Sequence, residues 1–340
     1  MNRSGARLSD IAKRTGYSKN TVSLALRDSP RIPETTREVI RAAASALNYR
    51  PNHAAKSLTS RQTKTIGLLL ADITNPILTE TSKALETELA RLGYGTLFAT
   101  SNNTLSDEIA AVEMFRSRQV DGMLVYPTRG RRDYKHLVDL RRSGFPIVMM
   151  IPGEEIGVDM VSVDEQRGAH MAVRHLIDLG HRRIGTIDGS NPDGNRQKFE
   201  GYVQALAGAG IDFDPAWQVE PLGFTPKAGY WAMDTLMNTA RPSAVFVAND
   251  YIAVGAVKWC LKHDLRIPED VAIIGFDNLE LGEFLSVALS SVSYQTELVT
   301  RMAIDRLIRL ISSPDQLPEP RVTLIEPELV IRESTGNAKR

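Results

Sequence analysis

Three polar residues near the N-terminus, Lys19, Asn20 and Ser23, share one face of a predicted helix over 19–26. Lysine binds phosphate groups, and asparagine and serine hydrogen-bond the base edges that are exposed in the grooves of duplex DNA. Ser18 precedes the helix and can cap it, because its hydroxyl can accept a hydrogen bond from an unpaired backbone N–H. These residue types at helical spacing predict a surface that contacts nucleic acid.

A second set of candidates consists of polar residues that come directly after apolar, strand-like runs. In open parallel sheets, ligands bind at the carboxyl ends of the strands. A carboxylate in such a place can accept hydrogen bonds from two hydroxyl groups of a small molecule at once. The alternative for one member, Asp250, is a plain N-cap of the next helix. The set comprises Asp72, Asn75, Asp164, Asn249 and Asp250.

The elements that must position the first set form a small helical segment. Helices are predicted over 8–15, with Ser9 as the N-cap, over 19–26 and over 34–47. Gly16 interrupts the periodicity between the first two helices, as the tight turn of a helix-turn-helix requires. The segment is therefore predicted to be an all-α domain.

The charge of the chain is unevenly distributed, although its net charge is zero. Residues 1–64 contain 13 Lys and Arg against 4 Asp and Glu, a net charge of +9, and the remaining residues carry −9. A compact basic end on an acidic body indicates that the first segment meets a polyanion.

From residue 65 onward, apolar strand-like runs alternate with helical stretches. One set of such units covers 65–150, a second covers 160–274, and final segments follow at 290–325. This alternation is typical of parallel sheets covered by helices on both faces. The sequence therefore predicts a helix-turn-helix headpiece followed by an α/β core of two parallel-sheet lobes.

Other classes of protein and site are disfavoured by what the sequence lacks. A single cysteine, Cys260, cannot form an internal disulfide and fits a reducing, cytoplasmic compartment. The apolar runs are far shorter than the ~18 residues that span a bilayer, and residues 1–10 have no apolar signal-peptide core. The six histidines lack metal-ligand spacing, and no phosphate-binding loop or nucleophile elbow occurs. We therefore expect no catalysis, no metal and no cofactor.

Two runs, LSDIAKRTGYSKNTVS at 8–23 and NYRPNHAAKSLTS at 48–60, resemble the headpiece of the lactose-repressor (LacI/GalR) family. The resemblance extends over nearly the whole chain. It implies a core with the architecture of periplasmic sugar-binding proteins. It also implies a ligand-responsive transcriptional regulator, usually a repressor of carbohydrate-related genes, that binds a pseudo-palindromic operator as a dimer or possibly a tetramer in the cytoplasm, on the nucleoid.

By this resemblance, the second predicted helix is the recognition helix, and Lys19 and Asn20 read the major groove. The third reading position is Leu24, where many family members have an arginine. Leu24 can offer only apolar contact, for instance to a thymine methyl group, unless it is a half-buried core residue. The residues that the resemblance places on DNA in this segment are Ser18, Lys19, Asn20, Thr21, Ser23 and Leu24.

The segment 52–59 resembles the family's hinge helix. Eight residues are too few for a helix that is stable alone in water, so we expect it to order only when two copies pair on DNA. Leu58 matches the leucine that family members insert into the minor groove; without the resemblance it would only be an apolar residue on an amphipathic turn. Asn52 and the small Ala55 are expected to contact DNA beside it.

The run NDYIAVG at 249–255 matches a family hallmark, in which the aspartate accepts hydrogen bonds from ligand hydroxyls. Phe224 matches an aromatic residue that stacks on the ligand ring, and its alternative is an ordinary core phenylalanine. Lys198 stands where family members usually have arginine, and Arg196 lies two residues before it. These two cations suggest an acidic or phosphorylated sugar as effector, unless they form a surface pair that faces solvent.

Two rival interpretations are a solute-binding protein that serves a transporter and a sugar-modifying enzyme. The basic headpiece disfavours the first, and the absence of catalytic motifs disfavours the second. The expected parts are a headpiece (1–51), a hinge and linker (52–64), an N-lobe (65–163 with 295–320), a C-lobe (164–294 with 321–334) and a tail (335–340).

Overall fold

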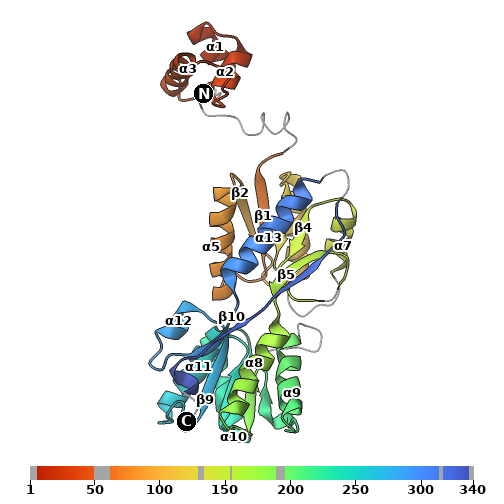
Figure 1. The fold of residues 1–340 in the computed structure, drawn as a ribbon, viewed down its shortest axis with the longest axis vertical. Helices are drawn as coiled ribbons and strands as arrows, with labels where there is room; N and C mark the ends of the chain where they lie inside the picture. The colour runs from red at the N-terminus through yellow and green to blue at the C-terminus, as the bar shows by residue number, and fades with distance from the viewer. Residues whose placement is uncertain are drawn as a thin grey trace. The chain divides into compact units, whose positions relative to one another are not determined.

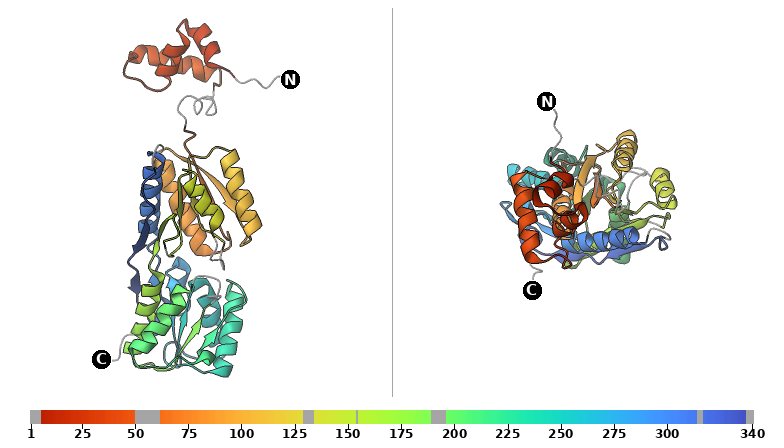
Figure 2. Two further views of the ribbon diagram at one scale, coloured as in Figure 1. Left: turned by 90° about the vertical axis from the view of Figure 1, so that its right-hand side faces the viewer. Right: turned by 90° about the horizontal axis from the view of Figure 1, so that it is seen from above.

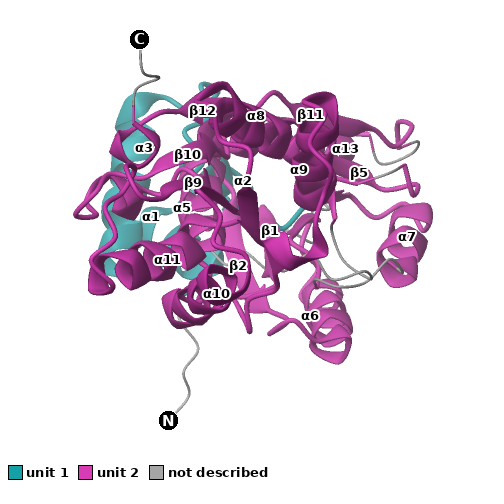
Figure 3. Ribbon diagram, turned by 90° about the horizontal axis from the view of Figure 1, so that it is seen from below, with its two compact units in different colours: residues 1–63 teal, residues 64–340 magenta. Residues whose placement is uncertain are grey.

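The computed structural model describes residues 6–49, 62–128, 134–153, 155–188, 196–313 and 317–336. The chain divides into two compact units, residues 1–63 and residues 64–340 (Figure 3). The expected hinge contacts Asn52, Ala55 and Leu58 lie outside the described residues. Within the described ranges, no helix combines the length and apolar character that crossing a membrane requires.

The headpiece packs its three helices around a small apolar core. The side chains of Ile11, Val22 and Ile40, one from each helix, are fully buried there. Gly16 follows the first helix with a φ of +76° and donates its N–H to the carbonyl oxygen of Ala12, a conformation that favours glycine. The helices are α1 (Leu8–Thr15), α2 (Lys19–Ala25) and α3 (Glu34–Ala46).

The start of α1 differs from the prediction. The N-cap is Arg7, and Ser9 lies inside the first turn. The reason is Asp10, whose carboxylate accepts the backbone N–H of Arg7 at 2.8 Å. A carboxylate in the first turn also interacts favourably with the helix dipole, so it can define the start without a polar cap residue.

The N-lobe is a six-stranded parallel sheet in the order β11-β5-β4-β3-β1-β2. Leu68 and Leu70 of β1 join one hydrophobic cluster and Leu69 joins another, because side chains alternate along a strand. α5 and α13 lie side by side over the first face (Figures 1 and 2), and α6 and α7 cover the other. The elements are β1 (Thr65–Leu70), α5 (Pro76–Arg91), β2 (Gly95–Thr100), α6 (Leu105–Ser117), β3 (Gly122–Val125), α7 (Lys135–Arg142), β4 (Ile147–Met149), β5 (Asp159–Val163), α13 (Thr296–Ile311) and β11 (Val322–Ile325).

The C-lobe repeats this construction with the sheet order β12-β10-β9-β8-β6-β7. Phe246 of β8 faces the cluster under α8 and α9, and its neighbours Val245 and Val247 face the cluster under α10 and α11. The elements are α8 (Glu165–Asp178), β6 (Ile184–Ile187), α9 (Gln197–Gly208), η1 (Pro215–Trp217), β7 (Gln218–Val219), α10 (Pro226–Thr239), β8 (Ala244–Val247), α11 (Asp250–Lys262), β9 (Ala272–Asp277), α12 (Glu280–Glu283), β10 (Ser290–Ser293), β12 (Glu328–Val330) and η2 (Glu333–Thr335).

The chain crosses between the lobes after β5, after β10 and between β11 and β12. The third crossing corrects a predicted boundary, because residues 321–325 belong to the N-lobe and not to the C-lobe. Strand β11 pairs in parallel with β5, with Val322 opposite Met160, and only β12 joins the C-lobe sheet, antiparallel to β10. The chain that leaves α13 thus adds a strand to the edge of its own lobe before it crosses.

Asp159, at the start of β5, is fully buried and faces two arginines. Its carboxylate accepts hydrogen bonds from Nε of Arg141 at 2.9 Å, from Nε of Arg306 at 2.5 Å and from the backbone N–H of Arg321 at 3.1 Å. Both guanidinium groups also donate to carbonyl oxygens of the segment before β11. One carboxylate therefore ties α7, α13 and the approach to β11 to the N-lobe sheet.

Candidate functional sites

Helix α2 presents the first set of candidate residues at its exposed start. Ser18 is the N-cap, as predicted, and its hydroxyl accepts the backbone N–H of Thr21 at 3.0 Å. Lys19 and Asn20 are exposed, while Thr21 and Ser23 are half-buried. The first turn of the helix therefore carries polar side chains that can reach a binding partner.

Leu24 is half-buried in the isolated headpiece. The partly buried residues that pack against the headpiece core include Leu26 and Leu47 but not Leu24. A leucine that is left out of the core and lies one turn after Lys19 and Asn20 is suited to apolar contact with a partner. This placement favours the DNA-facing interpretation of Leu24 over the core interpretation.

The strands of both sheets end at the junction between the lobes. Strand β5 passes directly into the C-lobe, and β10 passes directly into the N-lobe. The other strands run parallel to these two, apart from β12, so their carboxyl ends lie at the same edges. Asp72 and Asn75 follow β1. Asn249 follows β8, and Asp277 is the last residue of β9. These residues thus lie at the two sheet edges that meet at the junction.

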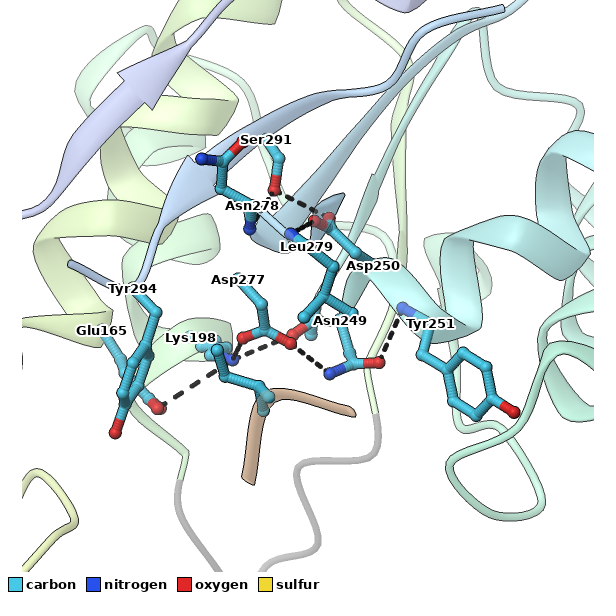
Figure 4. Close-up of polar contacts among 12 residues, drawn as sticks. Glu165, Lys198, Asn249, Asp250, Tyr251, Asp277, Asn278, Leu279, Ser291 and Tyr294 are labelled. Carbon is cyan, nitrogen blue, oxygen red and sulfur yellow. Dashed lines mark hydrogen bonds and ion pairs between the residues drawn. The ribbon is translucent and has the colours of Figure 1, made fainter. Parts of the chain in front are cut away.

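Lys198 of α9 lies at the centre of a polar cluster in the C-lobe (Figure 4). Its Nζ donates to the carbonyl oxygen of Ala248 at 2.9 Å and lies 3.8 Å from Oδ1 of Asp277 and 3.9 Å from Oε1 of Glu165. The ammonium also lies over the ring of Phe276, 3.9 Å from its centroid. The positive charge of Lys198 is therefore already balanced by two carboxylates of the protein.

Asn249 connects this cluster to helix α11. Its Oδ1 caps the helix by accepting the N–H groups of Tyr251 at 2.9 Å and Ile252 at 3.2 Å. Its amide nitrogen donates to the carboxylate of Asp277. The cap fixes the side chain, so Asn249 holds Asp277 from one side while Lys198 faces it from another.

Asp250, the aspartate of the NDYIAVG run, does not face the cluster. It is fully buried, and its Oδ1 accepts the hydroxyl of Ser291 at 2.7 Å while its Oδ2 accepts the N–H of Leu279 at 2.9 Å. Burial, and next the negative charge of Asp277, raise the pKa of Asp250 well above its usual value. This geometry contradicts the predicted contact between Asp250 and a ligand, and the N-cap alternative is also wrong because Asn249 is the cap.

Three other predicted effector residues make local contacts that start helices or turns. Asp72 accepts the N–H and the hydroxyl of Thr74, each at 2.8 Å. Asn75 is buried and caps α5 through Ile77 at 3.3 Å, and Asp164 caps α8. All three residues follow strands that end at the lobe junction. Each side chain can therefore make its local contact and still contact a ligand.

Arg196 and Phe224 lie outside the cluster of Lys198. The Arg196 guanidinium lies over the ring of Phe199, 5.6 Å from its centroid. Phe224 is half-buried and packs against the apolar cluster under α10 and α11, which agrees with its core alternative.

Two members of the cluster, Asp277 and Glu165, are not among the residues predicted from the sequence. The second predicted set of strands and helices ends at residue 274, but strand β9 continues to Asp277 and places this residue at the sheet edge. Glu165 directly follows Asp164 and shares its position after β5. The signal for both is their position, because each lies within three residues of the end of a predicted strand.

Two family descriptions match the chain. "Bacterial regulatory proteins, lacI family" matches residues 7–52, and "Periplasmic binding protein-like domain" matches residues 173–335. The first range contains helices α1 to α3, and the second contains most of the C-lobe, together with α13, β11 and β12.

Characterised relatives align with nearly the whole chain. The HTH-type transcriptional repressor PurR of Haemophilus influenzae (strain PittEE) is 31% identical over 332 residues, which is 97% of this chain and 98% of that protein. The ribose operon repressor of Haemophilus influenzae (strain ATCC 51907 / DSM 11121 / KW20 / Rd) is 32% identical over 336 residues, 98% of this chain and 100% of that protein.

Solved structures share the fold. The lac repressor dimer bound to operator and the anti-inducer ONPF has a TM-score of 0.87 at 22% identity, with 98% of this chain and 99% of that chain covered. The complex of the transcriptional regulator CelR with cellobiose has a TM-score of 0.72 at 28% identity, with 97% and 99% covered. The predicted architecture of a helix-turn-helix headpiece on a two-lobe α/β core is thereby confirmed.

Proposed function

This chain belongs to the lacI family of bacterial regulatory proteins and is therefore a DNA-binding transcriptional regulator rather than an enzyme. We propose that it is a cytoplasmic repressor controlled by a neutral, hydroxyl-rich effector. Two chains pair through the core, so that two headpieces occupy the half-sites of a pseudo-palindromic operator. The effector binds at the lobe junction and changes operator affinity through a coupling free energy of about 1–3 kcal/mol.

The proposed DNA contacts begin at the start of α2. Lys19 and Asn20 are exposed there and read base edges, while Leu24 makes apolar contact. The hinge contacts of the proposal, Asn52, Ala55 and Leu58, rest on the family resemblance alone, because they lie outside the described residues. The recognition residues of the proposal are Ser18, Lys19, Asn20, Thr21, Ser23 and Leu24.

The class of effector is inferred from the partners of Lys198. Its ammonium lies 3.8 Å from Asp277 and 3.9 Å from Glu165, so its positive charge already has carboxylate partners within the protein. Lys198 is therefore poorly placed to recruit an acid or a phosphate, whereas the hydroxyl groups of a neutral sugar can donate to the carboxylate oxygens. This one observation replaces the acidic-sugar hypothesis that Lys198 and Arg196 suggest in the sequence.

The names of similar proteins support a carbohydrate. CelR, 28% identical to this chain, is described in complex with cellobiose, and the Haemophilus influenzae relative at 32% identity is a ribose operon repressor. The effector residues of the proposal are Asp277, Asn249, Glu165 and Lys198, with Asp72, Asn75 and Asp164 at the same junction.

Calorimetric titration of the full chain tests the effector class. The panel pairs neutral sugars (D-ribose, D-glucose and cellobiose) with charged derivatives (D-glucuronate and D-glucose 6-phosphate). For matched pairs we expect the charged derivative to bind at least about tenfold more weakly, because one buried repulsive contact costs on the order of 1.4 kcal/mol. Equal or tighter binding of glucuronate or glucose 6-phosphate than of glucose would contradict the proposal.

Substitution of the α2 residues tests the DNA contacts. An operator is first selected from a random duplex library, and Asn20→Ala and Lys19→Ala are then compared on it and on random DNA. We expect each variant to bind the operator about 10- to 100-fold more weakly, with a much smaller loss on random DNA, because base-edge contacts carry the discrimination. Lys227→Ala, an exposed lysine of the core, is the control. An equal loss on both duplexes would mean that these side chains contact phosphates only.

A further inference from the structure

One turn in the C-lobe is held by a buried carboxylate whose two oxygens both accept hydrogen bonds from the protein. We infer that Asp250 is a positioning residue: it holds the turn 277–279 in the conformation that presents Asp277 to Lys198 and to the effector. The expected change in sugar binding rests on the proposed function, whereas the expected change in the turn rests on the contacts of Asp250 alone.

The turn after β9 contains two successive residues with positive φ, +109° at Asp277 and +54° at Asn278. Asparagine tolerates the left-handed region in which Asn278 lies. A residue with a Cβ rarely adopts the φ of Asp277, and such a conformation persists only where the surroundings enforce it. Asp277 is also the residue whose carboxylate faces Lys198 and Asn249. The orientation of this carboxylate therefore requires tethers outside the turn.

The tethers lead back to Asp250 (Figure 4). The N–H of Leu279 donates to Oδ2 of Asp250 at 2.9 Å. The N–H of Asn278 donates to the hydroxyl of Ser291 at 3.0 Å, and the same hydroxyl donates to Oδ1 of Asp250 at 2.7 Å. One carboxylate thus fixes both residues that follow Asp277, the first through Ser291 on β10 and the second directly.

The space around Asp250 is built for this arrangement. A Cβ at Gly275 would collide with Oδ1 of Asp250, so the glycine leaves room for the carboxylate against β9. Leu279 and Leu289 are fully buried beside it. Both oxygens of Asp250 are engaged by protein groups in an enclosed site, which leaves this side chain no contact with a small molecule.

Two substitutions at Asp250 separate hydrogen bonding from other roles. Asparagine can keep both contacts, because its Oδ1 can accept from Leu279 and its amide can donate to the Ser291 hydroxyl, which then reverses its role. Burial and Asp277 raise the pKa of Asp250, so a neutral side chain is compatible with this site. Alanine removes both tethers.

Hydrogen–deuterium exchange of the full chain without effector measures the turn directly. We expect Asp250→Ala to speed exchange of the Asn278 and Leu279 amides by about tenfold or more, because their acceptors are lost, and Asp250→Asn to stay within about threefold of the unsubstituted chain. Ser291→Ala, a milder change, should speed exchange at Asn278. Asp270→Asn is the control: it replaces a surface aspartate of the same lobe, which pairs with Arg266, and should leave the turn unchanged.

Titration with the neutral sugars of the panel gives the functional measurement. For a sugar that binds the unsubstituted chain, Asp250→Ala should weaken binding by about tenfold or more and Asp250→Asn should restore most of it. Unchanged exchange at residues 278–279 in Asp250→Ala and in Ser291→Ala would overturn the inference, as would full sugar affinity in Asp250→Ala. If no sugar of the panel binds, the effector class is wrong, and the exchange result alone decides the role of Asp250.

Discussion

Asp277→Ala should abolish the response to effector while leaving effector-free operator binding intact. Asp277 is the carboxylate that faces Lys198 at 3.8 Å and accepts the amide of Asn249. Hydrogen bonds to a charged group contribute about 1.5–3 kcal/mol each, so the loss of one or two should weaken binding of the neutral sugars on the order of 100-fold. The measurement is titration of the purified variant with the panel sugars, together with operator binding in the presence and absence of each sugar.

The control for Asp277→Ala is Asp270→Ala, an aspartate of the same lobe that pairs with Arg266 on the surface. It should keep both sugar affinity and the response. Loss of operator binding without effector in Asp277→Ala would show that the residue supports the fold of the core rather than the effector site. Unchanged sugar affinity would remove Asp277 from the proposed site.

The elements of the fold follow closely from the sequence where one local signal decides. Gly16 and the apolar spacing on either side of it place α1 and α2, and α1 has the predicted bounds of 8–15. The prediction that residues 321–325 belong to the C-lobe is wrong because the pairing of β11 with β5 depends on where α13 leaves the chain. No local pattern in residues 321–325 indicates this pairing.

The candidate site was predictable in its location but not in its members. The rule that ligands bind at the carboxyl ends of parallel strands identifies the lobe junction, and Asn249 and Lys198 lie there. The same rule cannot distinguish Asp250 from Asp277. That choice depends on Gly275, which opens a space behind β9, and on Ser291, which comes from a strand 41 residues later in the chain.

This contrast has a physical origin. A cap or a tight turn is decided by groups within four residues, so Ser18 and Asn249 cap helices wherever the chain places those helices. A buried carboxylate must instead find its partners across strands, because burial without hydrogen bonds costs several kcal/mol. Asp250 and Asp159 are both of this second kind, and their roles become visible only when the sheets are assembled.

Asp159→Ala should lower the free energy of unfolding of the core by about 3–5 kcal/mol, because removing one partner of a buried ion pair leaves an uncompensated charge. Here two guanidinium groups, those of Arg141 and Arg306, would lose the carboxylate that they share. Urea unfolding followed by circular dichroism measures the change.

The surface pair of Asp139 with Lys135 provides the matched control for Asp159→Ala, since both aspartates contact cations from α7 but Asp139 is exposed. Asp139→Ala should leave the unfolding midpoint nearly unchanged, because water screens an exposed pair. A small effect of Asp159→Ala, comparable with that of Asp139→Ala, would mean that water or the carbonyl oxygens before β11 satisfy both arginines without the carboxylate. A large effect would establish that the approach to β11, and with it the third crossing between the lobes, is held by a single buried charge.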